Sequence, residues 1–270
     1  MKAPTNRELF FIMIESLQNQ NIKKIQRLQK KTKRRKDEQL IVVEGIREIK
    51  IALQNNYQFT EFYVCNAIYN NQIKIKDTRI IDVSEQVYQK IAYRSTTEGI
   101  IGLAKPKKHN LLDLKLEQKH PLILIAEAPE KPGNIGALLR TADAANLDAV
   151  IIANPKTDLY NPNIIRSSLG TVFSKQIGMG STQEVIDFLR EKEISIYAAT
   201  LQNSNVYTKE DFTQASAVVV GTESKGLSKL WRTAAKQNIN IPMQGSIDSM
   251  NVSVSAAIII FEAKRQRDLK

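Results

Sequence analysis

The run Val218-Val219-Val220 leads directly into Gly221-Thr222-Glu223-Ser224-Lys225-Gly226. The branched apolar residues predict a buried strand, and the glycines that bound the next segment predict a tight polar loop. Groups placed directly after a parallel strand line the crevice in which open α/β sheets bind their ligands. This stretch therefore predicts an α/β domain with a ligand site at the carboxyl ends of its strands.

Two further segments place polar residues or glycine after apolar runs. One is Asn134-Ile135-Gly136-Ala137-Leu138-Leu139-Arg140-Thr141, and the other is Ile241-Pro242-Met243 followed by Ser249-Met250-Asn251-Val252-Ser253. Neither contains a histidine, a cysteine or a metal-ligand cluster, so we expect chemistry based on oriented oxygens, amides and a guanidinium, without a metal. Asn134 also suits the N-cap of a helix, as do Asn163 and either Ser249 or Asn251 in their own segments.

The second half alternates continuous apolar runs with helical spacing, which is typical of a parallel sheet covered on both faces. The expected strands are 122–126, 149–153, 194–199, 217–220 and 239–241, and the expected helices are 134–145, 163–169, 182–191 and 252–267. Ser181-Thr182-Gln183-Glu184 predicts a capping box for the third helix.

The first half reads as a smaller α/β domain. Its expected strands are 39–45, 59–65, 79–83 and 99–104, and its expected helices are 46–54 and 84–93. Lys105-Pro106-Lys107-Lys108 breaks the pattern with a proline among charges. We therefore expect a domain at 1–105, a linker at 106–120 and a second domain at 121–270.

The chain is basic, with a formal net charge of +11 and a pI near 9.6, which favours a polyanionic partner, most simply nucleic acid. Six of the seven residues from Lys30 to Lys36 are cations, and we expect a solvated arm that contacts phosphates. The alternative is a solvated loop without that role. Arg166 and Ser168, in a short glycine-ended helix, are expected to face a groove or solvent.

Several classes of protein are excluded. The glycines around Asn134 do not form the G-x-G-x-x-G fingerprint of nicotinamide-binding enzymes, and the loop after Val220 is not a G-x-x-x-x-G-K-[ST] phosphate loop. The apolar run at residues 9–14 is too short for a secretory signal, and no apolar stretch reaches transmembrane length. A cytoplasmic protein is the expectation.

Taken as a set, these motifs resemble a known family. Asn134-x-Gly136-x-x-x-Arg140-Thr141, Arg166-x-Ser168-x-Gly170 and Gly221-x-Glu223-x-x-Gly226, with the segments around Pro242 and Asn251, resemble the signatures of SpoU-type RNA ribose 2′-O-methyltransferases of the SPOUT superfamily. More weakly, Val42-Val43-Glu44-Gly45 and Glu98-Gly99-Ile100-Ile101-Gly102 resemble an L30e-type substrate-binding domain.

The resemblance implies a C-terminal trefoil knot, S-adenosylmethionine (AdoMet) as methyl donor, and a homodimer with active sites near the subunit interface. It implies a cofactor site formed by Thr200, Leu201, Gly221, Ile241, Met243 and Met250. Separately from the resemblance, the basic run and the segment around Arg166 give the expected RNA-binding set: Lys30, Lys31, Lys33, Arg34, Arg35, Lys36, Arg166 and Ser168.

The resemblance nominates Arg140 for activation of the ribose hydroxyl. Because free arginine stays protonated, with a pKa above about 12, Arg140 acts as a base only if another group takes up its proton. The other role is to clamp the adjacent phosphate and the developing alkoxide. Asn134, Glu223, Ser249 and Asn251 are implied to orient Arg140, the ribose and the sulfonium.

Three functions stay open. The first is 2′-O-methylation of ribosomal RNA, which the L30e-like front domain favours. The second is 2′-O-methylation of transfer RNA. The third is a non-catalytic RNA-binding or ribosome-assembly factor with the same fold, which the presence of Asn134, Arg140, Glu223 and Asn251 argues against.

Overall fold

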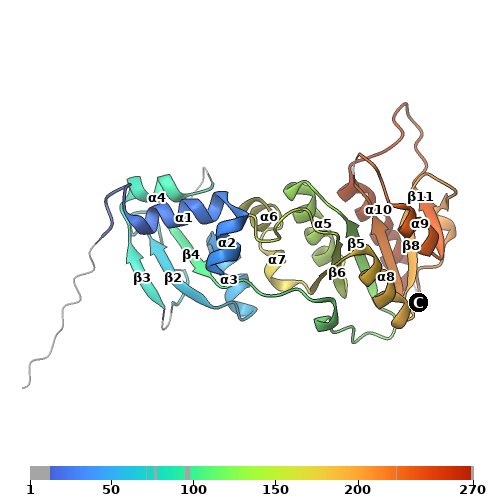
Figure 1. Ribbon diagram of the computed structural model, residues 1–270, viewed down its shortest axis with the longest axis horizontal. Coiled ribbons are helices and arrows are strands. Elements are labelled where there is room, and N and C mark those ends of the chain that lie inside the picture. Colours follow the sequence, from blue (N-terminus) through green and yellow to red (C-terminus); the bar gives the residue numbers. More distant parts are fainter. Residues whose placement is uncertain (1–12, 71, 76–77, 95–97, 223, 269–270) are drawn as a thin grey trace, which may run out of the picture. The chain divides into compact units, whose positions relative to one another are not determined.

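The chain forms two compact units that meet in sequence between Pro106 and Lys107. The computed structural model describes residues 13–70, 72–75, 78–94, 98–222 and 224–268 (Figure 1). Across these ranges, the helices are too short or too polar for any of them to cross a lipid bilayer.

The N-terminal unit is built on a four-stranded sheet. Its strands are β1 (Ile41–Glu44), β2 (Phe59–Val64), β3 (Arg79–Asp82) and β4 (Ile100–Ala104), in the spatial order β1-β4-β2-β3. Strand β4 pairs antiparallel with β1 and β2, and β2 pairs parallel with β3. Helices α1 (Gln20–Lys30) and α4 (Glu85–Ile91) bury apolar side chains in one cluster with this sheet. Helix α3 (Ile46–Gln54) directly follows β1, as predicted.

The basic run at residues 30–36 is helical apart from Lys31, which has extended backbone between two helices, so the prediction of a solvated arm is wrong. Helix α1 ends at Lys30, and a second helix, α2, spans Thr32–Glu38. Arg35 is only 4% exposed, and its guanidinium donates to the carbonyl groups of Leu28 and Gln29. These are carbonyls that the end of a helix leaves without an internal partner. Arg35 therefore fixes the corner between the two helices, and the prediction that it contacts RNA is wrong.

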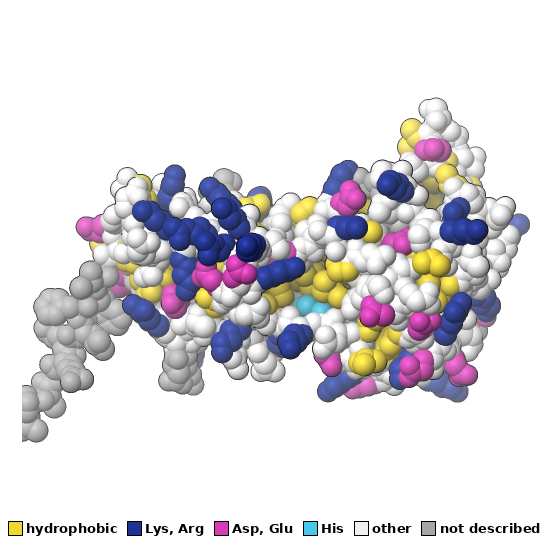
Figure 2. All heavy atoms as spheres, viewed as in Figure 1, with side chains coloured by type: hydrophobic (Ala, Val, Ile, Leu, Met, Phe, Trp, Pro, Cys, Tyr) yellow, Lys and Arg dark blue, Asp and Glu magenta, His cyan; other side chains and the backbone are white. Residues whose placement is uncertain are grey.

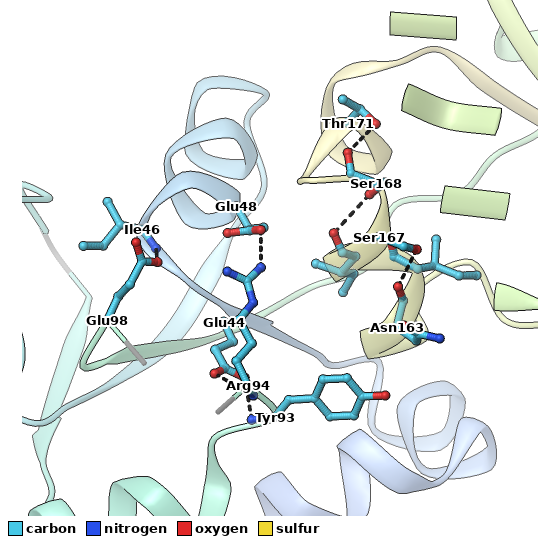
Figure 3. Close-up of polar contacts among 12 residues, drawn as sticks. Glu44, Ile46, Glu48, Tyr93, Arg94, Glu98, Asn163, Ser167, Ser168 and Thr171 are labelled. Carbon is cyan, nitrogen blue, oxygen red and sulfur yellow. Dashed lines mark hydrogen bonds and ion pairs between the residues drawn. The ribbon is translucent and has the colours of Figure 1, made fainter. Parts of the chain in front are cut away.

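The glutamates in the two segments that resemble an L30e-type domain, Glu44 and Glu98, form hydrogen bonds within this unit (Figure 3). The Glu44 carboxylate accepts hydrogen bonds from the backbone N–H groups of Tyr93, at 2.7 Å, and Arg94, at 3.3 Å. The Glu98 carboxylate accepts from the N–H of Ile46, at 2.7 Å, where α3 begins. Burial raises the pKa of Glu44, and the two N–H groups oppose that shift.

The C-terminal unit contains a seven-stranded, parallel sheet. The strands are β5 (Leu122–Glu127), β6 (Ala149–Ala153), β7 (Ile177–Gly180), β8 (Ser195–Ala199), β9 (Asn205–Val206), β10 (Ser216–Val220) and β11 (Gln237–Asn240), in the order β7-β6-β5-β10-β8-β11-β9. Every residue of β5, β6 and β10 is buried, because helices cover both faces. The predicted parallel α/β sheet is therefore confirmed.

Among the described residues of this unit, six helices accompany the sheet: α5 (Pro132–Ala144), α6 (Pro162–Ser167), α7 (Thr171–Ser174), α8 (Thr182–Glu191), α9 (Lys229–Ala234) and α10 (Val252–Asp268). Helices α8 and α9 share an apolar cluster with one face, around the fully buried Trp231. Helices α5 and α10 contact each other and cover the other face (Figure 1). Single-turn 3₁₀ helices occur at Leu111–Asp113 and Tyr207–Lys209.

The helix starts show which capping predictions hold. The capping box of Ser181 and Glu184 is present at α8. Helix α5 begins at Pro132, two residues before Asn134, because proline is well suited to the first helical position. Asn134 is therefore not an N-cap. Helix α6 likewise begins at a proline, and its cap is Asn161 rather than Asn163.

Helices α5 and α6 approach closely at Gly136. A Cβ atom built there would lie 2.0 Å from Ser167 Oγ and 2.8 Å from the backbone nitrogen of Ser168. Contacts that short require one of the helices to move. The contact therefore fixes where α6 lies on α5, the helix that carries Asn134 and Arg140.

We predict that Gly136→Ala lowers the free energy of unfolding by about 1–3 kcal/mol, the usual cost of overpacking. Gly133→Ala is the matched control, because it lies in the same helix and its Cβ would meet nothing within 4 Å. Urea denaturation of the two variants measures the difference. Equal stability of Gly136→Ala and wild type would contradict the close approach.

Candidate functional site

A cavity of about 640 Å³ lies at the carboxyl ends of the adjacent strands β10, β8 and β11. Its walls come from the segments that follow these strands and from the start of α10. The six residues expected to bind a cofactor all line it: Thr200, Leu201, Gly221, Ile241, Met243 and Met250. Parallel pairing brings them together, because it places the carboxyl ends of these strands at one edge of the sheet.

The loop after β10 is closed by its own main chain. The N–H of Thr222 donates to the Gly226 carbonyl at 3.1 Å, and the N–H of Gly226 donates to the Thr222 carbonyl at 3.0 Å. A Cβ atom at Gly221 would lie 2.2 Å from the carbonyl carbon of Gly226, so the loop closes only over a glycine. The result is a wall of backbone groups held in one position. Glu223, expected to orient the reacting groups, lies outside the described residues.

Asn134 and Asn251 meet beside this cavity, although 117 positions separate them in sequence. The Nδ2 group of Asn251 donates to Asn134 Oδ1 at 3.2 Å. Asn251 Oδ1 also accepts from the N–H of Ser253 at 2.9 Å, which caps the start of α10. A second cavity of about 170 Å³ is lined by Asn134 and shares Gly221 and Thr222 with the first. The two cavities therefore adjoin.

Ser249 and Arg140 are placed differently. Ser249 lines the larger cavity and donates to Asp248 Oδ1 at 3.0 Å. Arg140 is exposed on α5 and is not among the described residues that line either cavity. The structure therefore brings together Asn134, Ser249 and Asn251, whereas the Arg140 guanidinium faces solvent.

Several lining residues escaped the sequence reasoning. Lys131 lines both cavities from the N-cap position of α5. Ser224 and Lys225 line the larger cavity from within the loop after β10, and Ser255 lines it from the first turn of α10. The sequence feature that could have identified them is their position inside or beside the motif segments. Their residue types do not distinguish them from ordinary surface residues.

The basic residues of α1 and α2 form an exposed surface on the N-terminal unit. Figure 2 shows lysine and arginine side chains gathered over these two helices. Five of the six predicted cations are exposed: Lys30, Lys31, Lys33, Arg34 and Lys36. We call these five residues the basic surface. Buried Arg35 does not belong to it.

Arg166 and Ser168, predicted to contact RNA, are placed differently. Arg166 is exposed at the end of α6. Ser168 is fully buried; its hydroxyl donates to the Ile165 carbonyl at 3.1 Å, and its own carbonyl accepts from the Thr171 hydroxyl at 2.8 Å (Figure 3). These bonds close the turn between α6 and α7. The prediction that Ser168 contacts RNA is therefore wrong.

Histidine contributes nothing to the cavity walls. His109 lies 2.8 Å from the Tyr160 hydroxyl through Nε2, and burial lowers its pKa to about 4. It is therefore neutral at pH 7. Within the ranges described above, neither His109 nor His120 lines either of the two adjoining cavities, and no cluster of His, Cys, Asp and Glu side chains could hold a metal ion.

Comparisons with known proteins cover both units. Residues 121–261 match the SpoU rRNA Methylase family, and residues 19–102 match the MRM3-like substrate binding domain.

Several relatives match this chain over nearly the whole length of both proteins. A crystal structure of an RNA 2'-O ribose methyltransferase is 37% identical with a TM-score of 0.84, covering 95% of this chain and 99% of that one. The 23S rRNA (guanosine(2553)-2'-O)-methyltransferase RlmP of Bacillus subtilis is 26% identical over 251 residues, which is 93% of this chain and 98% of that protein. AviRb of Streptomyces viridochromogenes, solved in complex with AdoMet, shows the same fold at 24% identity, with a TM-score of 0.82 over 93% of this chain and 98% of its own. The chain therefore belongs to the SpoU rRNA Methylase family.

Proposed function

We propose that this protein transfers a methyl group from AdoMet to a ribose 2′-hydroxyl of ribosomal RNA. The observation that carries the proposal is the cavity at the strand ends, because it gathers all six residues expected to bind the cofactor. Family membership supports the reaction, and the name of the RlmP relative supports ribosomal RNA as the substrate.

The cavity suits a nucleotide cofactor. Its volume of about 640 Å³ lies within the range of small-molecule sites, roughly 300–1,000 Å³. The hydrogen bonds between Thr222 and Gly226 hold the main chain of this loop in place, so that it can receive a base without rearranging. When bound, AdoMet supplies an electrophilic methyl group. Thr200, Ile241, Met243 and Met250 hold its adenosine portion in this proposal, and Leu201 covers it at the rim.

We predict that Gly221→Ala weakens AdoMet binding at least tenfold, because the new methyl group forces Gly221 away from Gly226 and opens the loop. Gly245→Ala is the matched control, since its Cβ meets nothing within 4 Å and Gly245 does not line the cavity. Isothermal titration calorimetry measures both affinities. Wild-type affinity in Gly221→Ala would exclude the loop as part of the cofactor site.

The target ribose is proposed to lie at the smaller cavity, beside Asn134 and Asn251. These amides and Ser249 orient the 2′-hydroxyl toward the methyl group, and such positioning contributes up to about 7–11 kcal/mol. Arg140 is proposed to clamp the phosphate and the developing alkoxide. Glu223 is proposed to help orient these groups.

A homodimer fits the placement of Arg140. Its guanidinium is exposed and does not line the cavities of its own chain. A second copy docked at this surface would bring Arg140 to a shared site. The trefoil knot belongs to the same proposal on the ground of the family resemblance, and a cytoplasmic location on the ground of the ribosomal RNA substrate that the name of the RlmP relative gives.

We predict that Arg140→Ala reduces methyl transfer by at least 100-fold, the cost of losing one strong charge-stabilising group. AdoMet affinity should stay within twofold of wild type. Arg190→Ala, another exposed arginine, on α8, is the control and should retain full turnover. Transfer of a radiolabelled methyl group to RNA measures turnover. Wild-type turnover by Arg140→Ala would contradict the assigned role.

Mapping of ribose methylation in ribosomal and transfer RNA from a deletion strain distinguishes the substrates. Loss of one 2′-O-methyl group from ribosomal RNA supports the proposal, and loss from transfer RNA favours the second candidate. Purified protein that binds no AdoMet at high concentration would favour a non-catalytic RNA-binding factor.

The basic surface is proposed to bind the RNA backbone, together with Arg166. We predict that Arg34→Ala weakens RNA binding and lowers its salt dependence without changing stability, because Arg34 is exposed. Arg35→Ala should instead lower the free energy of unfolding by about 1–3 kcal/mol, because it leaves buried carbonyls without a donor. Filter binding at several salt concentrations and urea denaturation separate the two effects. If Arg34→Ala and Arg35→Ala had the same RNA affinity and the same stability, the exposed position of Arg34 and the buried position of Arg35 would be contradicted.

A further inference from the structure

Glu127, the last residue of β5, carries a buried carboxylate that no motif nominated. The residue is 6% exposed. Its Oε1 accepts from the Thr182 hydroxyl at 3.1 Å, and its Oε2 accepts from the backbone N–H of Ser228 at 2.8 Å. Thr182 begins α8, and Ser228 precedes α9, so one carboxylate joins the starts of two helices.

The orientation of this carboxylate is set by a third residue. Asn154 Nδ2 donates to the Thr182 hydroxyl oxygen at 2.8 Å, and Asn154 Oδ1 accepts from the N–H of Thr182 at 3.2 Å. Because the Thr182 oxygen accepts from Asn154, its single proton is directed to Glu127. Oε2 is thereby left to face Ser228.

Ser228 stands at the far end of the loop that lines the larger cavity. The near end leaves β10 at Val220, which pairs with Ala126, the neighbour of Glu127 on β5. Strand β5 therefore holds both ends of the loop, one through sheet pairing and the other through the Glu127 carboxylate. The second of these two ties depends on a side chain.

We propose that Glu127 is a positioning residue for the cofactor site. Its carboxylate fixes the Ser228 end of the loop and thereby keeps the Gly221–Gly226 backbone in the conformation that receives the nucleotide. This inference rests on the function proposed above. The alternative is that Glu127 stabilises the fold alone.

The test compares two buried glutamates. Glu127→Gln preserves size but replaces one acceptor oxygen with an NH₂ group, so either Ser228 or Thr182 loses its acceptor. Glu44→Gln is the matched control, because Glu44 is also buried and accepts backbone N–H groups, but in the N-terminal unit. Thr182→Val, which removes only the orienting hydroxyl, decides the question if Glu127→Gln does not fold.

Two measurements are made on the full chain: AdoMet affinity by calorimetry, and hydrogen exchange of the backbone amides without cofactor. For Glu127→Gln we expect at least a tenfold rise in Kd and faster exchange at Thr222 and at residues 224–228, with unchanged exchange in β5 and β10. Thr182→Val should show the same changes, smaller in size. Glu44→Gln should leave the Kd within twofold of wild type.

The outcomes are distinguishable. Faster exchange with unchanged affinity would reduce Glu127 to a structural residue, and unchanged exchange would show that it does not hold the loop; either result overturns the inference. Wild-type protein that binds no AdoMet overturns the proposed function, and with it any role for Glu127 in cofactor binding. The exchange data would then report only whether the carboxylate holds the loop.

Discussion

The parallel pairing of β10 with β5 on one side and β8 on the other is the constraint on which the rest of the site depends. Parallel strands have their carboxyl ends at the same edge of the sheet, so the loops that follow them lie close together there. With β11 beside β8, three loops and the start of α10 enclose one cavity. Burial on both faces holds the paired strands in place, and the strand ends in turn fix where the loops begin.

The sequence predicted the features that apolar patterning controls. The long branched runs at Val218–Val220 and Ile123–Ile125 have no other stable place than a covered sheet, so their strands were predictable. Strand β7 was not predicted, because two of its four residues are glycine. Helices α7 and α9, with four and six residues, are too short to show a period. The cavity walls were foreseeable from the loops that follow strands, but the contact between Asn134 and Asn251 required the tertiary fold.

Residue type alone did not predict the position of polar side chains that hydrogen-bond to main-chain groups. Arg35 looks like its exposed neighbours in sequence, yet it lies inside the corner of two helices because carbonyl groups at the end of α1 need a donor there. Ser168 is buried for a similar reason, at a turn between short helices. Glu127 and Glu44 are buried for the corresponding reason, because their carboxylates accept hydrogen bonds from backbone N–H groups. In each case the decisive partner is a main-chain group, which carries no signature in the sequence.

The helical state of the basic surface has a consequence for how this protein would meet its partner. A flexible arm has to become ordered on contact, and fixing each residue costs about 1–2 kcal/mol of backbone entropy. Helix α2 already holds Lys33, Arg34 and Lys36 in place, so that cost is met during folding instead. Attachment through this surface would then draw its free energy chiefly from released counterions, and it would proceed as docking of a preformed shape rather than as folding upon binding.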